Sequence, residues 1–511
     1  MFPHNGRMPT DATPEDRLEK SPFKELATIV ATHGIGENAT WRSRIDSAVA
    51  SLFGTRYEKD AEKTIAIRAP GKTGDNNVPF AALIHPTNPE QGAYSGMSVV
   101  VFPVDGAACL VTFGVGTNGI SPDEELLGNP GHARKVQAVC AWLNHKHGRG
   151  AQVAWAKYDP VRIDVTLPTK VSTELPAYAS VFQRYGKELY GIYAPTTGNT
   201  EAILDVLSAF LDLMFEARGF GVLTPQRPDA IEVRAQWQKF LLPSLTQSDL
   251  KQLLNDRRYV VIQGPPGTGK TRMAENILAS DYAGNGTSIQ FHPNTTYESF
   301  VGGLAPQVTE ATVGLQFAPT PGHLMEAVRQ ARMRPDQPYL LHIDEINRAD
   351  ISKILGEAIY LLEVHPDKPR TIELSYDFGE PFGRKLTIPD NLHILGTMNT
   401  ADRSLAIVDV AVRRRFSFVD LWPQSAVVQE LGGEVARDAF ARLLTIFIDH
   451  ASGDAFNLVP GHSYFLNKDD KAMKAELRVT LVPLLQEYLS QGYVTGFSEH
   501  IRGYLQWIDS L

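Results

Sequence analysis

The chain has 511 residues, of which 43% are hydrophobic, 21% are charged and only two are cysteines. This composition is typical of a soluble globular protein with about three domains, and it excludes a disulfide scaffold or a cysteine-rich zinc module. The formal charge of −9 argues against a surface that is basic throughout, although a local basic patch is compatible with it. No apolar run reaches the roughly 18 residues of a membrane span, and residues 1–20 lack the apolar stretch of a secretory signal. We therefore expect a cytoplasmic protein without a membrane partner.

We expect residues 1–20 to be a flexible tail and residues 21–225 to form an N-terminal α+β domain with an antiparallel sheet. Short apolar runs alternate with turn signals in this region, and Asp105-Gly106 separates two of these runs as a tight β-hairpin turn would. Clustered proline and polar residues then indicate a linker at 226–244.

After the linker, strand and helix patterns alternate over residues 245–424. This alternation predicts a parallel sheet with crossover helices. Residues 425–511 have a mainly helical pattern.

A glycine-rich motif follows the apolar run at 258–263 and precedes a helical pattern. It has the P-loop form G-x-x-x-x-G-K-T, in which backbone N–H groups curl around phosphates and the helix N-terminus favours an anion. Lys270 is expected to reach the β- and γ-phosphates, and Thr271 is expected to bind Mg²⁺. The predicted nucleotide-binding residues of this loop are Gly264, Pro265, Pro266, Gly267, Thr268, Gly269, Lys270 and Thr271.

Two later apolar runs end in polar residues that can complete such a site. The run 339–343 ends in Asp344 and Glu345, and ligands collect at the carboxyl ends of parallel strands. Asp344 can bind nucleotide through Mg²⁺, and Glu345 can polarise an attacking water. The run 392–398 ends in Asn399, whose amide can orient that water near the γ-phosphate. An ordinary Asn/Asp turn is the alternative for this last segment.

Arg413, Arg414 and Arg415 are consecutive, and they cannot all face one way on a helix because neighbours are about 100° apart. One or two of them can point across a subunit boundary at a neighbour's γ-phosphate, as an arginine finger does. A solvated basic helix end, favoured by the helix dipole, is the alternative.

Together these motifs resemble the AAA+ superfamily, and more narrowly the McrB family of motor subunits from modification-dependent (type IV) restriction systems. The resemblance covers about residues 245–490, nearly half of the chain. It implies an α/β P-loop AAA+ core at 245–424 with a helical lid at 425–511, preceded by the α+β N-terminal domain. The segments that carry it are 343–349, 351–357, 396–404, 412–416, 461–465 and 481–488.

The resemblance also implies a ring, usually a hexamer, with nucleotide bound between subunits. McrB proteins use GTP, so GTP with Mg²⁺ is the expected cofactor. ATP is the alternative, because a P-loop contacts only phosphates. The resemblance implies that Glu345 and Asn399 are catalytic, together with Asp402 and Arg403 of the family's signature loop, residues 396–404 here. It also implies that Arg414 and Arg415 act in trans, with Arg413 as a further candidate.

Residues 78–85, 96–104 and 108–114 are similar to the DNA-reading domain in front of some McrB motors. That domain flips a modified base into an aromatic-lined pocket, so DNA, including DNA with modified bases, is an expected partner. The aromatic residues available for such a pocket are Trp41, Tyr57, Phe80, Tyr94, Phe102 and Trp155, although strand aromatics usually belong to the core. Candidate phosphate contacts are Arg42, Arg44, Arg56, Lys59, Arg68 and Lys72, with scattered surface charge as the alternative.

The sequence contains no nuclease motif, so the resemblance implies a McrC-type nuclease subunit as a second partner. The alternative from another functional class is a MoxR-like ATPase that remodels a protein partner. The acidic net charge favours this alternative slightly, whereas the signature loop at 396–404 disfavours it.

Overall fold

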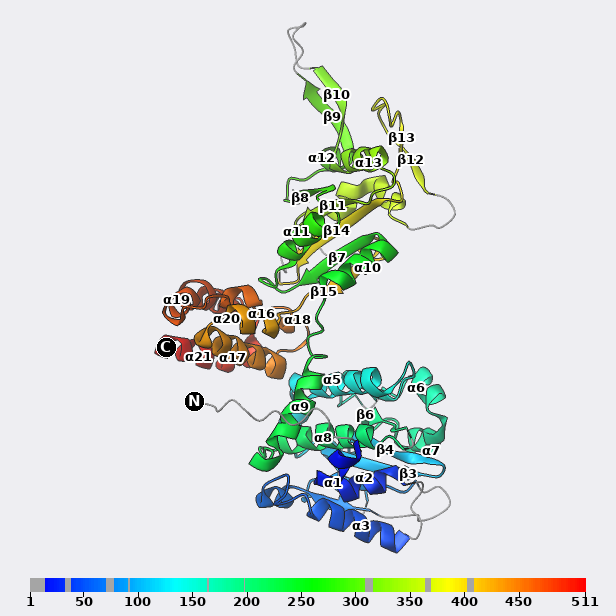
Figure 1. The fold of residues 1–511 in the computed structure, drawn as a ribbon, viewed down its shortest axis with the longest axis vertical. Helices are drawn as coiled ribbons and strands as arrows, with labels where there is room; N and C mark the ends of the chain where they lie inside the picture. The colour runs from blue at the N-terminus through cyan, green and yellow to red at the C-terminus, as the bar shows by residue number, and fades with distance from the viewer. Residues whose placement is uncertain are drawn as a thin grey trace. The chain divides into compact units, whose positions relative to one another are not determined.

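The computed structural model describes residues 14–32, 38–69, 78–90, 92–162, 165–196, 198–307, 316–363, 369–401 and 409–511 (Figure 1). The chain divides into two compact units. The N-terminal unit comprises Met1–Leu241 with Ile448–His450, and the C-terminal unit comprises Leu242–Phe447 with Ala451–Leu511. Among the residues described, none of the helices combines the length and apolar character that crossing a bilayer requires.

The N-terminal unit is built on a six-stranded antiparallel sheet with the strand order β1-β2-β3-β4-β6-β5. The hairpin between β3 and β4 turns at Asp105-Gly106, where Gly106 has a φ of 81°, and this confirms the predicted turn. The strands are β1 (Ala66–Arg68), β2 (Ala81–Ile84), β3 (Met97–Val104), β4 (Ala107–Val115), β5 (Ala154–Ala156) and β6 (Leu189–Tyr193).

Helices cover both faces of this sheet, which explains why β3 and β4 are almost continuously apolar. On one face, Val100 and Phe102 pack with Val171 and Val181 of α6 and α7. On the other face lie α2 and α8. The helices of the unit are α1 (Pro14–Lys20), α2 (Lys24–Ala31), α3 (Asn38–Ala50), α4 (Glu124–Gly128), α5 (Pro130–His147), α6 (Thr169–Glu174), α7 (Ala179–Tyr185), α8 (Thr200–Ala217) and α9 (Arg227–Gln238). The predicted α+β architecture is thereby confirmed.

Parts of the expected tail and of the expected linker are helices held by ion pairs. Residues 1–13 lie outside the described residues, but α1 follows them, and its Arg17 pairs with Asp205 at 2.7 Å and with Asp229 of α9 at 3.1 Å. The fully buried Arg56 pairs with Asp212 at 2.6 Å and also with Asp229 at 3.0 Å. Helix α9 occupies most of the segment 226–244, because a proline is well tolerated in a first helical turn and these charges hold it in place.

The core of the C-terminal unit is a five-stranded parallel sheet with the order β15-β7-β14-β11-β8. Alternate side chains of β7 point to opposite faces: Val260 and Ile262 pack with Ile277 of α11, whereas Val261 packs with Val328 of α13. This arrangement confirms the predicted α/β core with crossover helices. The strands are β7 (Tyr259–Gly264), β8 (Gly286–Gln290), β11 (Tyr339–Asp344), β14 (Leu392–Asn399) and β15 (Ser417–Asp420).

Two antiparallel hairpins and a set of helices complete this unit (Figure 1). The hairpins are β9 (Gly302–Gln307) with β10 (Gln316–Pro321) and β12 (Thr371–Glu373) with β13 (Lys385–Thr387). The helices of the core are α10 (Gln247–Arg257), α11 (Lys270–Ser280), α12 (Tyr297–Phe300), α13 (His323–Met333), α14 (Ile351–Leu355) and α15 (Val410–Arg413). The helical lid contains α16 (Ser425–Leu431), α17 (Glu434–His450), α18 (Gly453–Phe456), α19 (Asp470–Glu476), α20 (Val482–Ser490) and α21 (Ser498–Ser510).

Candidate nucleotide-hydrolysis site

The predicted site residues meet where three neighbouring strands end. In the register of the sheet, Asn399 at the end of β14 lies opposite Gly264 at the end of β7. On the other side of β14, strand β11 ends in Asp344, which Glu345 follows. The order of the strands therefore brings the glycine-rich loop, the two carboxylates and the amide to one edge of the sheet.

The glycine-rich loop connects β7 to α11 with the backbone that the motif requires. Gly267 and Gly269 have φ values of 78° and 80°, in the left-handed region that glycine adopts without steric cost. The side chain of Lys270 is buried, and its Nζ donates to the carbonyls of Gly264 at 3.0 Å and Pro265 at 2.7 Å. These contacts keep the ammonium group inside the loop, close to where phosphates bind in P-loops.

Asp344 is positioned by two threonines, one at the start of α11 and one near the end of β14. The hydroxyl of Thr271 donates to Oδ1 of Asp344 at 3.0 Å, and the hydroxyl of Thr397 on β14 donates to the same oxygen. Thr271 and Asp344 supply adjacent oxygen atoms, which are the ligands that Mg²⁺ prefers. Sequence reasoning missed Thr397, although it lies two residues before Asn399 on a strand that had already been singled out.

Glu345 is held beside the amide of Asn399. Asn399 Nδ2 donates to Oε1 of Glu345 at 2.7 Å, and the guanidinium of Arg348 lies 3.5 Å from the other carboxylate oxygen. Glu345 has a left-handed backbone, with φ 53° and ψ 46°, which is uncommon for a residue other than glycine and often marks a functional site. The side-chain amide of the buried Asn347 donates to the backbone carbonyl of Asn399 at 3.3 Å and so helps to hold Asn399 in place.

The three consecutive arginines lie in different environments. The guanidinium of Arg413 stacks on the Phe418 ring, 5.0 Å from its centroid. The side chain of Arg414 is 76% exposed and lies 3.5 Å from Glu363. Arg415 is partly buried and donates to the carbonyl of Ala411 at 2.8 Å. Of the three, Arg414 is the most available to another molecule, whereas Arg415 is engaged within its own segment.

Asp402 and Arg403, the candidate residues of the signature loop, lie outside the described residues.

The candidate residues for DNA recognition are distributed differently from the expectation. The proposed phosphate contact Arg56 is buried in its ion pairs with Asp212 and Asp229, which corrects that assignment. Arg42 and Lys59 are exposed, Arg44 and Arg68 are partly buried, and Lys72 lies outside the described residues. The candidate aromatic residues are buried or pack against the core; they are Trp41, Tyr57, Phe80, Tyr94, Phe102 and Trp155.

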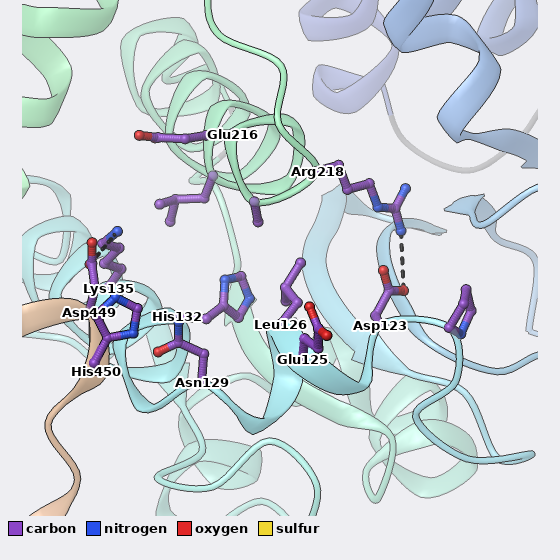
Figure 2. A pocket seen from close by; sticks show the side chains of 13 residues that line it. Asp123, Glu125, Leu126, Asn129, His132, Lys135, Glu216, Arg218, Asp449 and His450 are labelled. Carbon is purple, nitrogen blue, oxygen red and sulfur yellow. Dashed lines mark hydrogen bonds and ion pairs between the residues drawn. The ribbon is translucent and has the colours of Figure 1, made fainter. Parts of the chain in front are cut away.

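A pocket of the N-terminal unit lies beside α4 and the C-terminal end of α8 (Figure 2). Arg218 and Asp123 form a nearly buried ion pair in its wall, with an N–O distance of 3.4 Å. The carboxylates of Glu125 and Glu216 also line it. This acidic lining is opposite in charge to the surface that a DNA backbone requires.

Residues 259–416 match a protein-family model described as the AAA domain of the dynein-related subfamily. The matched segment begins at β7 and contains the P-loop, both carboxylates and Asn399. The fold, the geometry of the site and this match define the protein as an AAA+ P-loop NTPase.

Three proteins of similar sequence indicate which AAA+ proteins this chain resembles. The chain is 28% identical over 353 residues to the Type IV methyl-directed restriction enzyme EcoKMcrB subunit of Escherichia coli (strain K12), covering 63% of this chain and 75% of that protein. It is 26% identical over 194 residues to the Type II restriction enzyme BsuMI component YdiS of Bacillus subtilis (strain 168), covering 32% of this chain and 56% of the relative. It is 28% identical over 204 residues to the uncharacterized protein YehL of Escherichia coli (strain K12), covering 40% of this chain and 51% of that protein. Within the AAA+ class, the chain is therefore similar to restriction subunits of the McrB kind.

Proposed function

We propose that the protein is a ring-forming motor that recognises DNA, including DNA with modified bases, through its N-terminal unit. It hydrolyses GTP and thereby activates a separate McrC-type nuclease that cuts the DNA. One observation carries this proposal: a complete set of hydrolysis residues lies at one edge of the sheet, in a chain similar to a methyl-directed restriction subunit. These residues are Lys270, Thr271, Asp344, Glu345 and Asn399.

Each residue of the site has a defined chemical task in this proposal. The N–H groups of the P-loop and Lys270 bind the phosphate chain. The adjacent oxygens of Thr271 and Asp344, 3.0 Å apart, suit Mg²⁺, which supplies charge neutralisation at the phosphates when bound. Glu345 accepts a proton from the attacking water, and Asn399 fixes both the carboxylate and the water.

Assembly into a ring, usually a hexamer in this family, would complete the site in trans. The exposed Arg414 is the proposed arginine finger, because a planar guanidinium can neutralise charge on a neighbour's γ-phosphate. Arg415 and Arg413 are the further candidates from the same segment. Asp402 and Arg403 are proposed to lie at the same subunit interface.

The choice of nucleotide is tested by measuring phosphate release from GTP and from ATP with the purified full-length chain and Mg²⁺. The Glu345→Gln variant is the control for contaminating phosphatases. A preference for GTP is the expected result and supports the McrB-like role. A clear preference for ATP would refute the assignment of GTP and weaken the inherited restriction role.

DNA recognition is tested by titrating the full-length chain with methylated and unmethylated duplexes at several salt concentrations. Binding that weakens with a steep log–log dependence on salt is expected, because phosphate contacts release counterions. Replacing the exposed Arg42 and Lys59 with alanine should reduce the slope by about one to two. The absence of salt-dependent binding to any duplex would contradict the proposed DNA partner.

A further inference from the structure

The segment Gly461-His462-Ser463 of the lid lies directly against the P-loop. The backbone N–H of Gly461 donates to the carbonyl of Pro266 at 2.8 Å, and the N–H of Ser463 donates to the carbonyl of Gly267 at 3.0 Å. The segment leads into the short 3-10 helix η6 (His462–Phe465). Two consecutive carbonyls of the nucleotide-binding loop are therefore held by two main-chain donors of the lid.

These bonds determine where the loop directs its own donors. The carbonyl of Pro266 and the N–H of Gly267 belong to one peptide plane, and the carbonyl of Gly267 and the N–H of Thr268 belong to the next. In a trans peptide the two groups point in opposite directions. A lid donor that fixes the carbonyl on the outer side of the loop therefore aims the N–H toward its inner side, where phosphates bind.

The close approach of the lid segment to the P-loop explains why position 461 is a glycine. Its φ of −69° is an ordinary value, so the conformation itself does not require glycine. A Cβ at this position would lie 2.0 Å from the carbonyl carbon of Gly267 and 2.5 Å from the nitrogen of Thr268. Any side chain at 461 would displace the same peptide planes that the lid holds.

His462 ties this turn to the rest of the lid. The ring is buried, and its Nδ1 accepts the N–H of Gln424 at 3.2 Å, immediately before α16. Its Nε2 lies 3.6 Å from the point where a Cβ of Gly269 would be. Burial, and to a smaller extent the charge of Arg272, lowers the pKa of His462 to about 4, so the ring is neutral at pH 7 with its proton on Nε2.

We propose that residues 461–463, the lid turn, are a positioning element of the phosphate site. The turn fixes the peptide planes of the P-loop so that the N–H groups of Gly267 and Thr268 face the phosphate chain of a nucleoside triphosphate. The hydrogen bond between Gln424 and His462 also ties the turn to the segment that leads into α16. The proposal deepens the nucleotide-binding part of the proposed function and is independent of DNA or a nuclease partner.

The main test compares Gly461→Ala with Gly503→Ala in the full-length chain. Position 503 lies in α21 of the same lid, and a Cβ there meets no atom within 4 Å. Affinity for fluorescent GTP and ATP analogues is measured with Mg²⁺, and circular dichroism verifies folding. We expect Gly461→Ala to weaken binding by at least about tenfold, the loss expected for one misplaced hydrogen bond to a charged group. Gly503→Ala should stay within about twofold of the wild type.

A second pair of variants keeps the proposal testable if Gly461→Ala does not fold. His462→Asn can place an amide oxygen where Nδ1 accepts from Gln424, whereas His462→Leu cannot. We expect His462→Leu to raise the KM for nucleotide by about tenfold with little change in kcat, and His462→Asn to restore most of the affinity.

Binding by Gly461→Ala equal to that of the wild type would overturn the proposal. So would a fall in kcat at unchanged KM for His462→Leu, because that pattern would place the defect in the chemical step. A wild-type chain that binds nucleotide without hydrolysing it would contradict the hydrolytic role but leave the positioning role of the lid turn intact.

Discussion

The substitution Glu345→Gln separates the chemistry of the site from its architecture. Glutamine has the same shape as glutamate, and its amide oxygen can still accept the 2.7 Å hydrogen bond from Asn399. The variant loses the charge and the basicity of the carboxylate, while Lys270, Thr271, Asp344 and the P-loop remain. The structure therefore predicts a loss in the rate of hydrolysis with little loss in nucleotide affinity.

The magnitude follows from the role of the carboxylate. A positioned general base contributes about 10²- to 10⁴-fold, which corresponds to ~2.7 to 5.4 kcal/mol of transition-state free energy. The side chain of Glu345 is only 17% exposed, so bulk solvent is a poor substitute for it. The dissociation constant for nucleotide should change by less than about threefold, or ~0.6 kcal/mol.

The assay is phosphate release under single-turnover and steady-state conditions, combined with a nucleotide-binding titration of the same preparation. A matched control is Glu326→Gln, which removes a carboxylate of α13 that pairs with Arg329 at 2.7 Å. That variant should hydrolyse like the wild type. Full turnover by Glu345→Gln, or a loss of affinity as large as the loss of rate, would refute this reasoning.

Two further predictions concern subunit contacts and pH. Arg414→Ala should lower hydrolysis by up to about 10³-fold and regain activity when mixed with Glu345→Gln subunits, whose own Arg414 can reach the intact site of a neighbour. Absence of recovery in assembled mixed rings would argue against a role in trans. Burial, with the charge of Lys135 as a smaller cause, lowers the pKa of His132 to about 3. The imidazole of His132 therefore stays neutral in the folded chain at pH values below about 6.5, where it is protonated in the unfolded chain. Relative to His132→Gln, the wild type should therefore lose about 1.4 kcal/mol of stability per pH unit as the pH falls from about 6 to about 4, measured by urea unfolding. Parallel pH dependences of the two proteins would contradict this prediction.

The sheet and the residues at its edge could be predicted because their signals are local. Asp344 and Asn399 each follow an apolar run, and Lys270 lies within a motif of fixed spacing. Parallel strands bring their carboxyl ends to one edge, so three separate stretches of sequence converge without any knowledge of long-range packing. The hydrogen bond between Asn399 and Glu345 is a consequence of this convergence.

The residues that were misassigned depend on partners distant in sequence. An arginine such as Arg56 is usually found at the surface. Only the fold shows that it is buried and paired with Asp212, 156 residues away. Pro228 and its polar neighbours indicate a linker by composition, yet a proline in the first turn also suits a helix. The ion pairs of Asp229 with Arg17 and Arg56 favour the helix over the linker.

The lid turn could not be predicted for a different reason. It acts through main-chain N–H groups, which every residue except proline possesses, so no residue type marks the donors. The resemblance at 461–465 assigns the turn no contact, and the backbone angles of Gly461 give no sign that a glycine is required. The constraint comes from Gly267 and Thr268, nearly two hundred positions earlier in the chain.

The hydrogen bonds of the P-loop carbonyls indicate which contacts can change when a phosphate binds. The carbonyls of Gly264 and Pro265 accept from Lys270, but each also accepts from a second donor, the N–H of Thr400 at 3.0 Å and the hydroxyl of Thr268 at 3.0 Å. Lys270 can therefore turn to a phosphate without leaving either carbonyl unsatisfied.

The next two carbonyls of the loop differ from this pattern. Among the described residues, those of Pro266 and Gly267 accept from the lid turn. Separation of the lid from the loop would exchange each of these hydrogen bonds for one to water, which opposes it by about 0.5 to 1.5 kcal/mol for each carbonyl. Phosphate binding can thus redirect Lys270 while the lid turn stays in place, which makes the lysine the mobile element of the loop and the lid its fixed support.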